Sequence, residues 1–264
     1  EDVHLLTYYD ADSDVSVIMQ MGGNDSNIRE VYSYSYEADT WIQMNDRPSE
    51  TDMHYREALI FYDIDNDVGI LFESGSRKVF SYDVNTDTWT QLGDRPAELD
   101  NAILHSYYDS SENVGVIFQC SGSRGSNPED SVFHYTYNND SWYQAADCPD
   151  DIETLRGNSY YYDTARGVGV VLCFDTSGSE KIIGTCLYEP SNESWQFRNS
   201  NLPMIPYHNE IDMFFGSDIH EMGYLIIGNG AEAIYEIDIY GDTTYVGKTP
   251  SNLSNNWAND NIWL

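Results

Sequence analysis

Hydrophobic and polar positions follow one arrangement that returns along the chain at intervals of about 50 residues. In a typical copy, FYDIDNDVGILFES from Phe61, an aromatic stretch meets a polar Asp/Asn turn and then a run of apolar residues. This order predicts a β-hairpin. The second strand is apolar on both faces, as expected of a strand that lies between neighbouring sheets.

A third and a fourth strand are predicted in each copy. Period-two alternation, as in VYSYSYE (31–37), is typical of a half-buried strand, and a second tight turn then leads into a strand that carries Trp. The phrase YDVNTDTWTQLGDRP, which starts at Tyr82, returns in altered form at Tyr36, Tyr137 and Tyr188. Each copy is therefore expected to form a four-stranded antiparallel meander, and no stretch has the period of an amphipathic helix.

Three features recur in register: an apolar run that ends in paired glycine (22–23), a spaced tyrosine, and a tryptophan after an Asp/Thr/Ser turn. The tryptophans are Trp41, Trp89, Trp142 and Trp195, and Tyr245 takes the same place in a fifth copy. This pattern resembles the kelch repeat. Only the first copy keeps the paired glycine, and the last has lost its Trp.

The resemblance implies an all-β fold, a single β-propeller of five four-stranded kelch-type blades. The blades would cover about 4–50, 51–98, 99–150, 151–203 and 204–250, and 251–264 would form a C-terminal tail. Five blades are fewer than the family usually has. In such a fold the phrase repeats because each Tyr and Trp meets the same packing problem between blades.

The charge balance is strongly acidic, with 12 Lys and Arg against 45 Asp and Glu and a formal charge of −33. Nucleic acid is excluded as a partner because phosphate binding needs a cationic surface. The bias favours a halophilic protein, one bathed in divalent cations, or an acidic extracellular protein in ordinary salt. No run approaches the roughly 20 apolar residues of a membrane span.

Cysteines and glycosylation sequons bear on location. Cys120, Cys148, Cys173 and Cys186 have no C-x-x-C spacing, which argues against zinc and leaves disulfides or buried thiols. The sequons start at Asn24, Asn139, Asn192 and Asn252. With a first residue, Glu1, that is not Met, they favour an exported glycoprotein, extracellular or on the cell surface.

The resemblance also implies where a ligand would bind, because kelch propellers use the channel face lined by loops that lead into each first strand. Arg56 and Arg156 share one repeat position in these loops, and His54 and His208 share another; Glu210 lies nearby. Arginine matches carboxylate or phosphate in a fork geometry. The alternative is that each Arg pairs with a carboxylate of a neighbouring blade.

Two further arginines are interpreted as part of the repeat. Arg47 and Arg95 both stand in the tripeptide Asp-Arg-Pro. Asp46, Asp94 or the edge of the next blade are their expected partners.

The turns DADSD (10–14) and DIDND (63–67) place carboxylates at alternate positions, as calcium loops do. They lack the Gly and distal Glu of an EF-hand, so a plain turn is the alternative. Calcium is the one candidate cofactor, and its candidate ligands are Asp10, Asp12, Asp14, Asp63, Asp65 and Asp67.

Catalytic motifs such as G-x-S-x-G, H-E-x-x-H or a P-loop are absent from the sequence. Five-bladed propellers include glycosidases with carboxylates around the channel, and a glycan-binding or glycan-hydrolysing enzyme is the alternative function. The loops supply Glu57, Asp100, Glu153, Glu210 and Asp212 for that role.

The tail carries Trp257, Ile262, Trp263 and Leu264, which are unfavourable in water. It either packs back on the same propeller or docks on another subunit as an added strand, which would give a homopolymer. The preferred hypothesis is an exported acidic propeller that acts without catalysis, as a cell-surface or filament-forming protein-interaction module.

Overall fold

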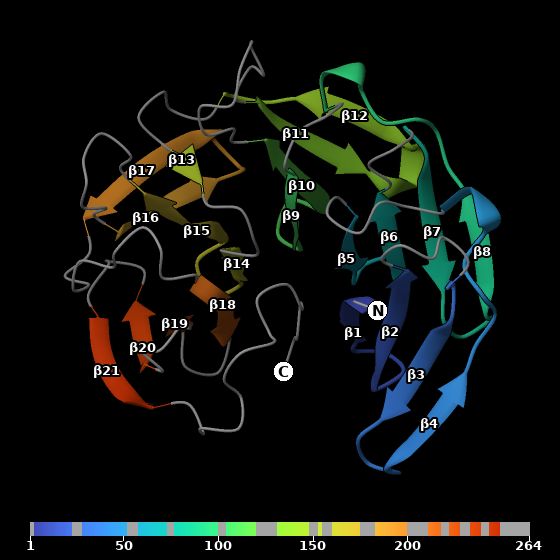
Figure 1. Ribbon diagram of the computed structural model, residues 1–264. Helices are drawn as coiled ribbons and strands as arrows, with labels where there is room; N and C mark the ends of the chain where they lie inside the picture. Colours follow the sequence, from blue (N-terminus) through green and yellow to red (C-terminus); the bar gives the residue numbers. More distant parts are fainter. Residues whose placement is uncertain are drawn as a thin grey trace. The chain divides into compact units, whose positions relative to one another are not determined.

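The computed structural model describes residues 3–22, 28–51, 58–72, 77–99, 104–119, 131–147, 153–154, 160–174, 183–199, 211–217, 222–227, 233–238 and 243–248 (Figure 1). Almost all regular structure in these ranges is β-strand, which confirms the all-β prediction. The helices among them are short 3-10 turns at Ser49–Thr51, Ala97–Leu99 and Tyr137–Asn139. Within the described ranges no helix is long and apolar enough to cross a membrane.

The strands of the described residues form antiparallel sheets of consecutive strands. The first sheet contains β1 (Val3–Asp10), β2 (Val15–Gly22), β3 (Val31–Ser35) and β4 (Thr40–Gln43). The second contains β5 (Leu59–Asp63), β6 (Val68–Phe72), β7 (Val79–Asp83) and β8 (Thr88–Gln91). The third contains β9 (Leu104–Asp109), β10 (Val114–Gln119), β11 (Ser131–Thr136) and β12 (Ser141–Gln144).

The fourth sheet departs from the four-stranded prediction. It contains β14 (Tyr160–Asp163), β15 (Val168–Phe174), β16 (Ile183–Glu189) and β17 (Ser194–Asn199), and a two-residue strand, β13 (Glu153–Thr154), also pairs with β15. The fifth sheet has four strands, β18 (Ile211–Ser217), β19 (Met222–Ile227), β20 (Ala233–Asp238) and β21 (Thr243–Lys248).

The described residues divide into two compact units. Those up to Ile117, together with Phe133–Gln144, form the first, and the remaining described residues form the second. The first and second sheets lie wholly in the first unit, and the fourth and fifth wholly in the second.

The hairpins end in residues with left-handed backbone conformation, which explains why the turns are rich in Asp and Asn. Asp67 has φ 55° directly before β6, and Asp87 has φ 51° directly before β8. Asp, Asn and Gly enter this region at the lowest cost. Equivalent residues end the other hairpin turns that the structure describes, namely Asp14, Asp39, Asn113, Asp140, Gly167 and Glu193.

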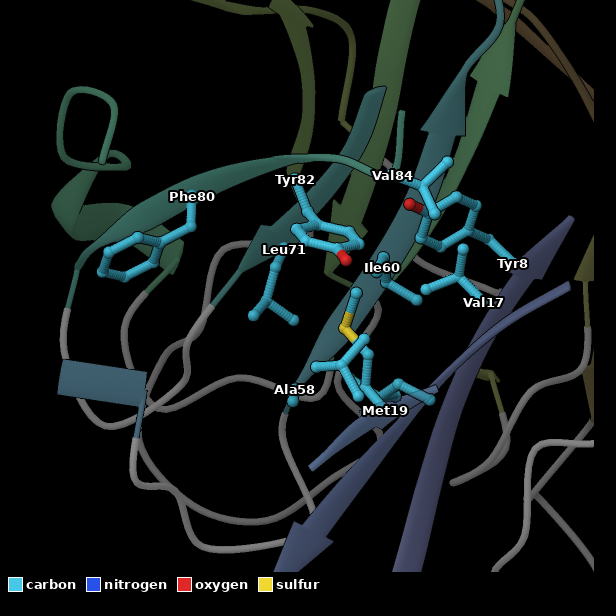
Figure 2. Packing of buried hydrophobic residues seen from close by; sticks show 11 residues of the cluster. Tyr8, Val17, Met19, Ala58, Ile60, Leu71, Phe80, Tyr82 and Val84 are labelled. Carbon is cyan, nitrogen blue, oxygen red and sulfur yellow. The ribbon is translucent and has the colours of Figure 1, made fainter. Parts of the chain in front are cut away.

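The inner strands β5, β6 and β7 of the second sheet are largely buried, and β6 is buried on both faces as its apolar pattern predicts. All five residues of β6 are buried. One face packs on the first sheet, where Val17 and Met19 lie against Leu71 and Tyr82 (Figure 2). The other face packs on the third sheet in a cluster of Leu59, Phe61, Val68, Ile70, Phe72, Val79, Leu99, Leu104, Ile117, Phe133 and Tyr135.

Each of the four tryptophans among the described residues stacks on the tyrosine seven residues before it, and most of these four also reach the preceding sheet. The ring centroids of Tyr82 and Trp89 are 4.5 Å apart. Trp142 meets Phe72 at 5.5 Å, edge to face. The predicted role of Tyr and Trp between sheets is therefore confirmed for these residues. It is wrong for Trp41, which stacks on Tyr34 but is 62% exposed.

Glycine lets neighbouring sheets approach closely in the first unit. A Cβ at Gly115 would overlap the Phe61 ring, and one at Gly69 would lie 2.5 Å from the Tyr8 ring. Both rings are buried, so neither can swing away into solvent. These positions accept no side chain without movement of the packed sheets.

Gly115→Ala is expected to destabilise the protein by about 1–3 kcal/mol because the added methyl overpacks the contact between the second and third sheets. Urea denaturation measures the change. Gly247→Ala is the control, since a Cβ there would meet nothing within 4 Å. Equal effects of the two substitutions would contradict the close packing at Gly115.

Candidate functional site

Most sequence-predicted site residues lie outside the described residues. This holds for the channel-face candidates Arg56, Arg156, His54, His208 and Glu210, for Glu57 and Asp100, and for the tail residues Trp257, Ile262, Trp263 and Leu264. It also holds for Asn24, Asn252, Cys120 and Cys148. Glu153 lies on β13, opposite Phe174, and Asp212 lies on β18, but the side chains of both are outside the described set. Their roles stay predictions.

Many of the side-chain hydrogen bonds among the described residues lie at the hairpin turns. In each of several hairpins a tyrosine hydroxyl donates to the side chain five residues later, which is the left-handed residue of the turn. The distances are 2.8 Å for Tyr82 to Asp87 and 2.9 Å for Tyr135 to Asp140. The same contact joins Tyr9 to Asp14, Tyr34 to Asp39, Tyr62 to Asp67, and Tyr108 to Asn113.

These tyrosines stay neutral donors. Burial, and then the hydrogen bond to Asp87, raise the pKa of the Tyr82 phenol. The same causes act in the same order on the pKa of Tyr135, through Asp140. The Tyr-x4-Asp spacing is visible in the sequence, yet it was missed because Tyr was interpreted only as packing material.

A second set of carboxylates stands at the start of the turn that joins the first hairpin of each of the first four sheets. Asp10 is 1% exposed, and its Oδ1 accepts the N–H groups of Asp12 and Ser13 at 3.0 and 2.9 Å. Asp63 likewise accepts the N–H and the side-chain amide of Asn66. Asp109 and Asp163 occupy the equivalent places in the third and fourth sheets and are also buried.

Five of the six predicted calcium ligands bond to a turn or to a tyrosine, and two of them, Asp10 and Asp67, contact the same Tyr62 hydroxyl. Asp10 and Asp63 hold their own turns, Asp14 and Asp67 accept from Tyr9 and Tyr62, Asp65 accepts from Tyr108 at 2.6 Å, and Asp12 is exposed. Among the described residues no three His, Cys, Asp or Glu side chains are grouped as metal ligands. Calcium therefore stays a prediction without support from this geometry.

Polar bonds also join neighbouring sheets. The Asn45 N–H donates to both oxygens of Asp87 at 2.9 and 3.0 Å, and the Gly93 N–H donates to Asp140 at 2.6 Å. Asp87 and Asp140 therefore hold their own turn and the preceding sheet at once.

Arg47 and Arg95 are structural, as the repeat suggested, but the structure gives them partners other than the expected ones. Arg47 is 3% exposed, and its Nη1 donates to the backbone oxygen and Oγ1 of Thr51, both at 2.7 Å. Its Nη2 donates to the carbonyl of Ile28 at 3.1 Å. Arg95 donates to the carbonyl of Leu99 in the same way. Asp46 and Asp94 are exposed.

Two observations bear on modification. Cys186 is disulfide-bonded and fully buried, which decides against a free thiol at this position. Asn139 and Asn192 are exposed, each directly before the left-handed residue of an outer turn. Ser141, the third residue of its sequon, donates from Oγ to Asn139 Oδ1 at 2.7 Å.

No protein-family model and no curated protein matches the chain. The crystal structure of TolB from Acinetobacter baumannii is similar in fold, with a TM-score of 0.57 and 9% sequence identity. The match covers 90% of this chain and 53% of that one, so the chain spans about half the length of TolB. At this identity the likeness concerns the fold alone. It is consistent with a β-propeller of four-stranded antiparallel sheets.

Proposed function

We propose that the chain is an exported, non-catalytic protein-interaction module, built as a five-bladed propeller of kelch type. The observation that carries the proposal is that the described carboxylates and tyrosine hydroxyls of the hairpins form hydrogen bonds within the protein's own turns and sheets. Asp10, Asp63, Asp109 and the tyrosines of the hairpins hold turns and link sheets. Sheets held in this way act as scaffolds, and recognition on such scaffolds falls to the loops between strands.

The kelch type is supported by the stack of Tyr on Trp seven residues later, which four sheets repeat with ring centroids 4.5 to 4.8 Å apart. The five antiparallel sheets support five blades. Export is supported by the disulfide at Cys186, because disulfides persist in oxidising compartments. The exposed sequons at Asn139 and Asn192 suit the same location.

The partner is a protein, and a second copy of this chain joined through the C-terminal residues is the specific form. The stretch 251–264 holds two Trp and one acid, Asp260, whereas the whole chain has a formal charge of −33. A nearly neutral apolar segment can join copies whose surfaces otherwise repel each other.

The test is the native mass by light scattering of the full chain and of residues 1–250, each at low and high salt. We expect the full chain to form assemblies that grow at high salt, where repulsion is screened. The shortened chain should stay monomeric. A monomer under all four conditions would refute self-assembly and leave a different protein as the partner.

A further inference from the structure

The contact between the first and second sheets holds two carboxylates against one hydroxyl. Tyr62, on β5, has its oxygen 3.1 Å from Asp10 Oδ1 and 2.8 Å from Asp67 Oδ1. A phenol has one proton and donates it fully to only one of the two oxygens. When both acids are ionised, the other oxygen contact is therefore repulsive.

A buried oxygen beside this hydroxyl has no donor. Asp10 is 1% exposed, and its Oδ2 accepts no hydrogen bond. The Asp67 carboxyl is within hydrogen-bonding reach of Asp10. The Oδ2 of Asp67 is occupied, since Asn85 Nδ2 donates to it at 2.8 Å, and Ser13 Oγ in turn donates to Asn85 Oδ1. A proton on the Asp67 carboxyl supplies the missing donor.

The titratable groups that act on Asp67 are acids and a phenol: Asp10 from β1, Tyr62 from β5, and Asp83 at the end of β7. The phenols of Tyr8 on β1 and Tyr82 on β7 also face this cluster. Burial raises the pKa of Asp67, the hydrogen bond from Tyr62 opposes this, and the charges of Asp10 and Asp83 raise it further.

We propose that Asp67 binds one proton as the pH falls and donates it to the Asp10 carboxylate, so that the contact between the first two sheets strengthens in acid and weakens as the pH rises. An acid whose pKa is higher in the folded state contributes stability that is complete below its ordinary pKa. That contribution is lost as the pH rises through the raised value. This proton site is independent of the proposed function.

The third sheet provides a natural comparison. Asn113 stands where Asp67 stands, and the Tyr108 hydroxyl lies 2.6 Å from Asp65 Oδ2 and 2.7 Å from Asn113 Oδ1. An amide that turns over donates to the hydroxyl, so this contact needs no extra proton. Asp67→Asn therefore introduces an arrangement that the chain already uses.

The test compares the melting temperatures of the full-length wild type and Asp67→Asn from acid to neutral pH at constant ionic strength. At neutral pH we expect the variant to melt about 2–4 °C above the wild type. The difference should fall toward zero below the ordinary Asp pKa, about 3.9. Asp39→Asn is the matched control, because it removes the same charge from a left-handed residue whose carboxyl accepts from the Tyr34 hydroxyl. Its melting temperature relative to the wild type should not fall in acid as that of Asp67→Asn does.

A spectroscopic measurement detects the proton itself. The infrared band of a protonated carboxyl should persist in the wild type at a pH where ordinary carboxyls are ionised, and Asp67→Asn should remove it. Tyr62→Phe should move the loss of the band to higher pH, because the Tyr62 hydrogen bond lowers the pKa of Asp67. No such band in the wild type, or parallel melting curves for Asp67→Asn and Asp39→Asn, would overturn the proposal.

Discussion

Replacing Arg47 with alanine is expected to lower the free energy of unfolding by about 3–4 kcal/mol. The guanidinium is buried, and it donates to two backbone carbonyls and one hydroxyl, those of Thr51 and Ile28. Hydrogen bonds to charged groups contribute about 1.5–3 kcal/mol each, and buried carbonyls left without donors cost about 1–3 kcal/mol. Desolvation of the arginine offsets part of this sum.

Urea is the right denaturant for this measurement, because guanidinium would screen the repulsion of a chain with a charge of −33. Arg198→Ala is the control. Arg198 is exposed and donates to Gln196, so its removal should change stability by less than about 0.5 kcal/mol. Arg47→Lys should recover part of the loss, since an ammonium cannot reproduce the fork geometry. A loss for Arg47→Ala no larger than for Arg198→Ala would show that Arg47 does not hold this turn.

The strands could be predicted from the sequence because their causes are local. Period-two alternation places one face of β3 inward, and a left-handed residue, most often Asp, ends each described hairpin turn whatever lies beyond it. Burial of β6 on both faces could also be predicted, because a strand of only apolar residues has no polar face that would be exposed to water. The short strand β13 was not predicted. Two residues carry no period, and the pairing depends on the extra length of β15.

Side-chain partners were harder to predict, because they depend on what lies across the sheet. Trp41 and Trp142 follow the same phrase, yet Trp142 reaches Phe72 of the preceding sheet and Trp41 is largely exposed. The repeat predicts that Arg47 pairs with its neighbour Asp46 or with the edge of the next blade. Asp46 is exposed, whereas the buried Arg47 side chain turns inward and donates to a backbone carbonyl. The candidate ligand site falls in loops between sheets, where no period or turn signal constrains a sequence-based prediction.

Phe72→Ala is expected to destabilise the protein by about 3–5 kcal/mol, the range for a buried aromatic replaced by alanine. Phe72 is 1% exposed on β6, and its ring meets those of Phe61, Tyr135 and Trp142 at 5.6, 6.2 and 5.5 Å. The cavity opens between the second and third sheets and cannot close without moving one of them. Ile64→Ala is the control, because Ile64 is 43% exposed on a turn of the same sheet.

The contact with Trp142 can be separated from the cavity by a double-mutant cycle. Phe72→Ala and Trp142→Ala should be coupled, with about 0.5–1.5 kcal/mol for the edge-to-face pair beyond the buried area. Phe72→Ala combined with Trp41→Ala should be additive, because Trp41 lies in the first sheet, stacked on Tyr34, and is largely exposed. Additive energies for the Phe72 and Trp142 pair would mean that these rings do not stabilise one another. Trp195 meets Phe118 of the preceding sheet in the same edge-to-face way, so the coupling energy measures one contact that holds a copy of the repeat to the copy before it.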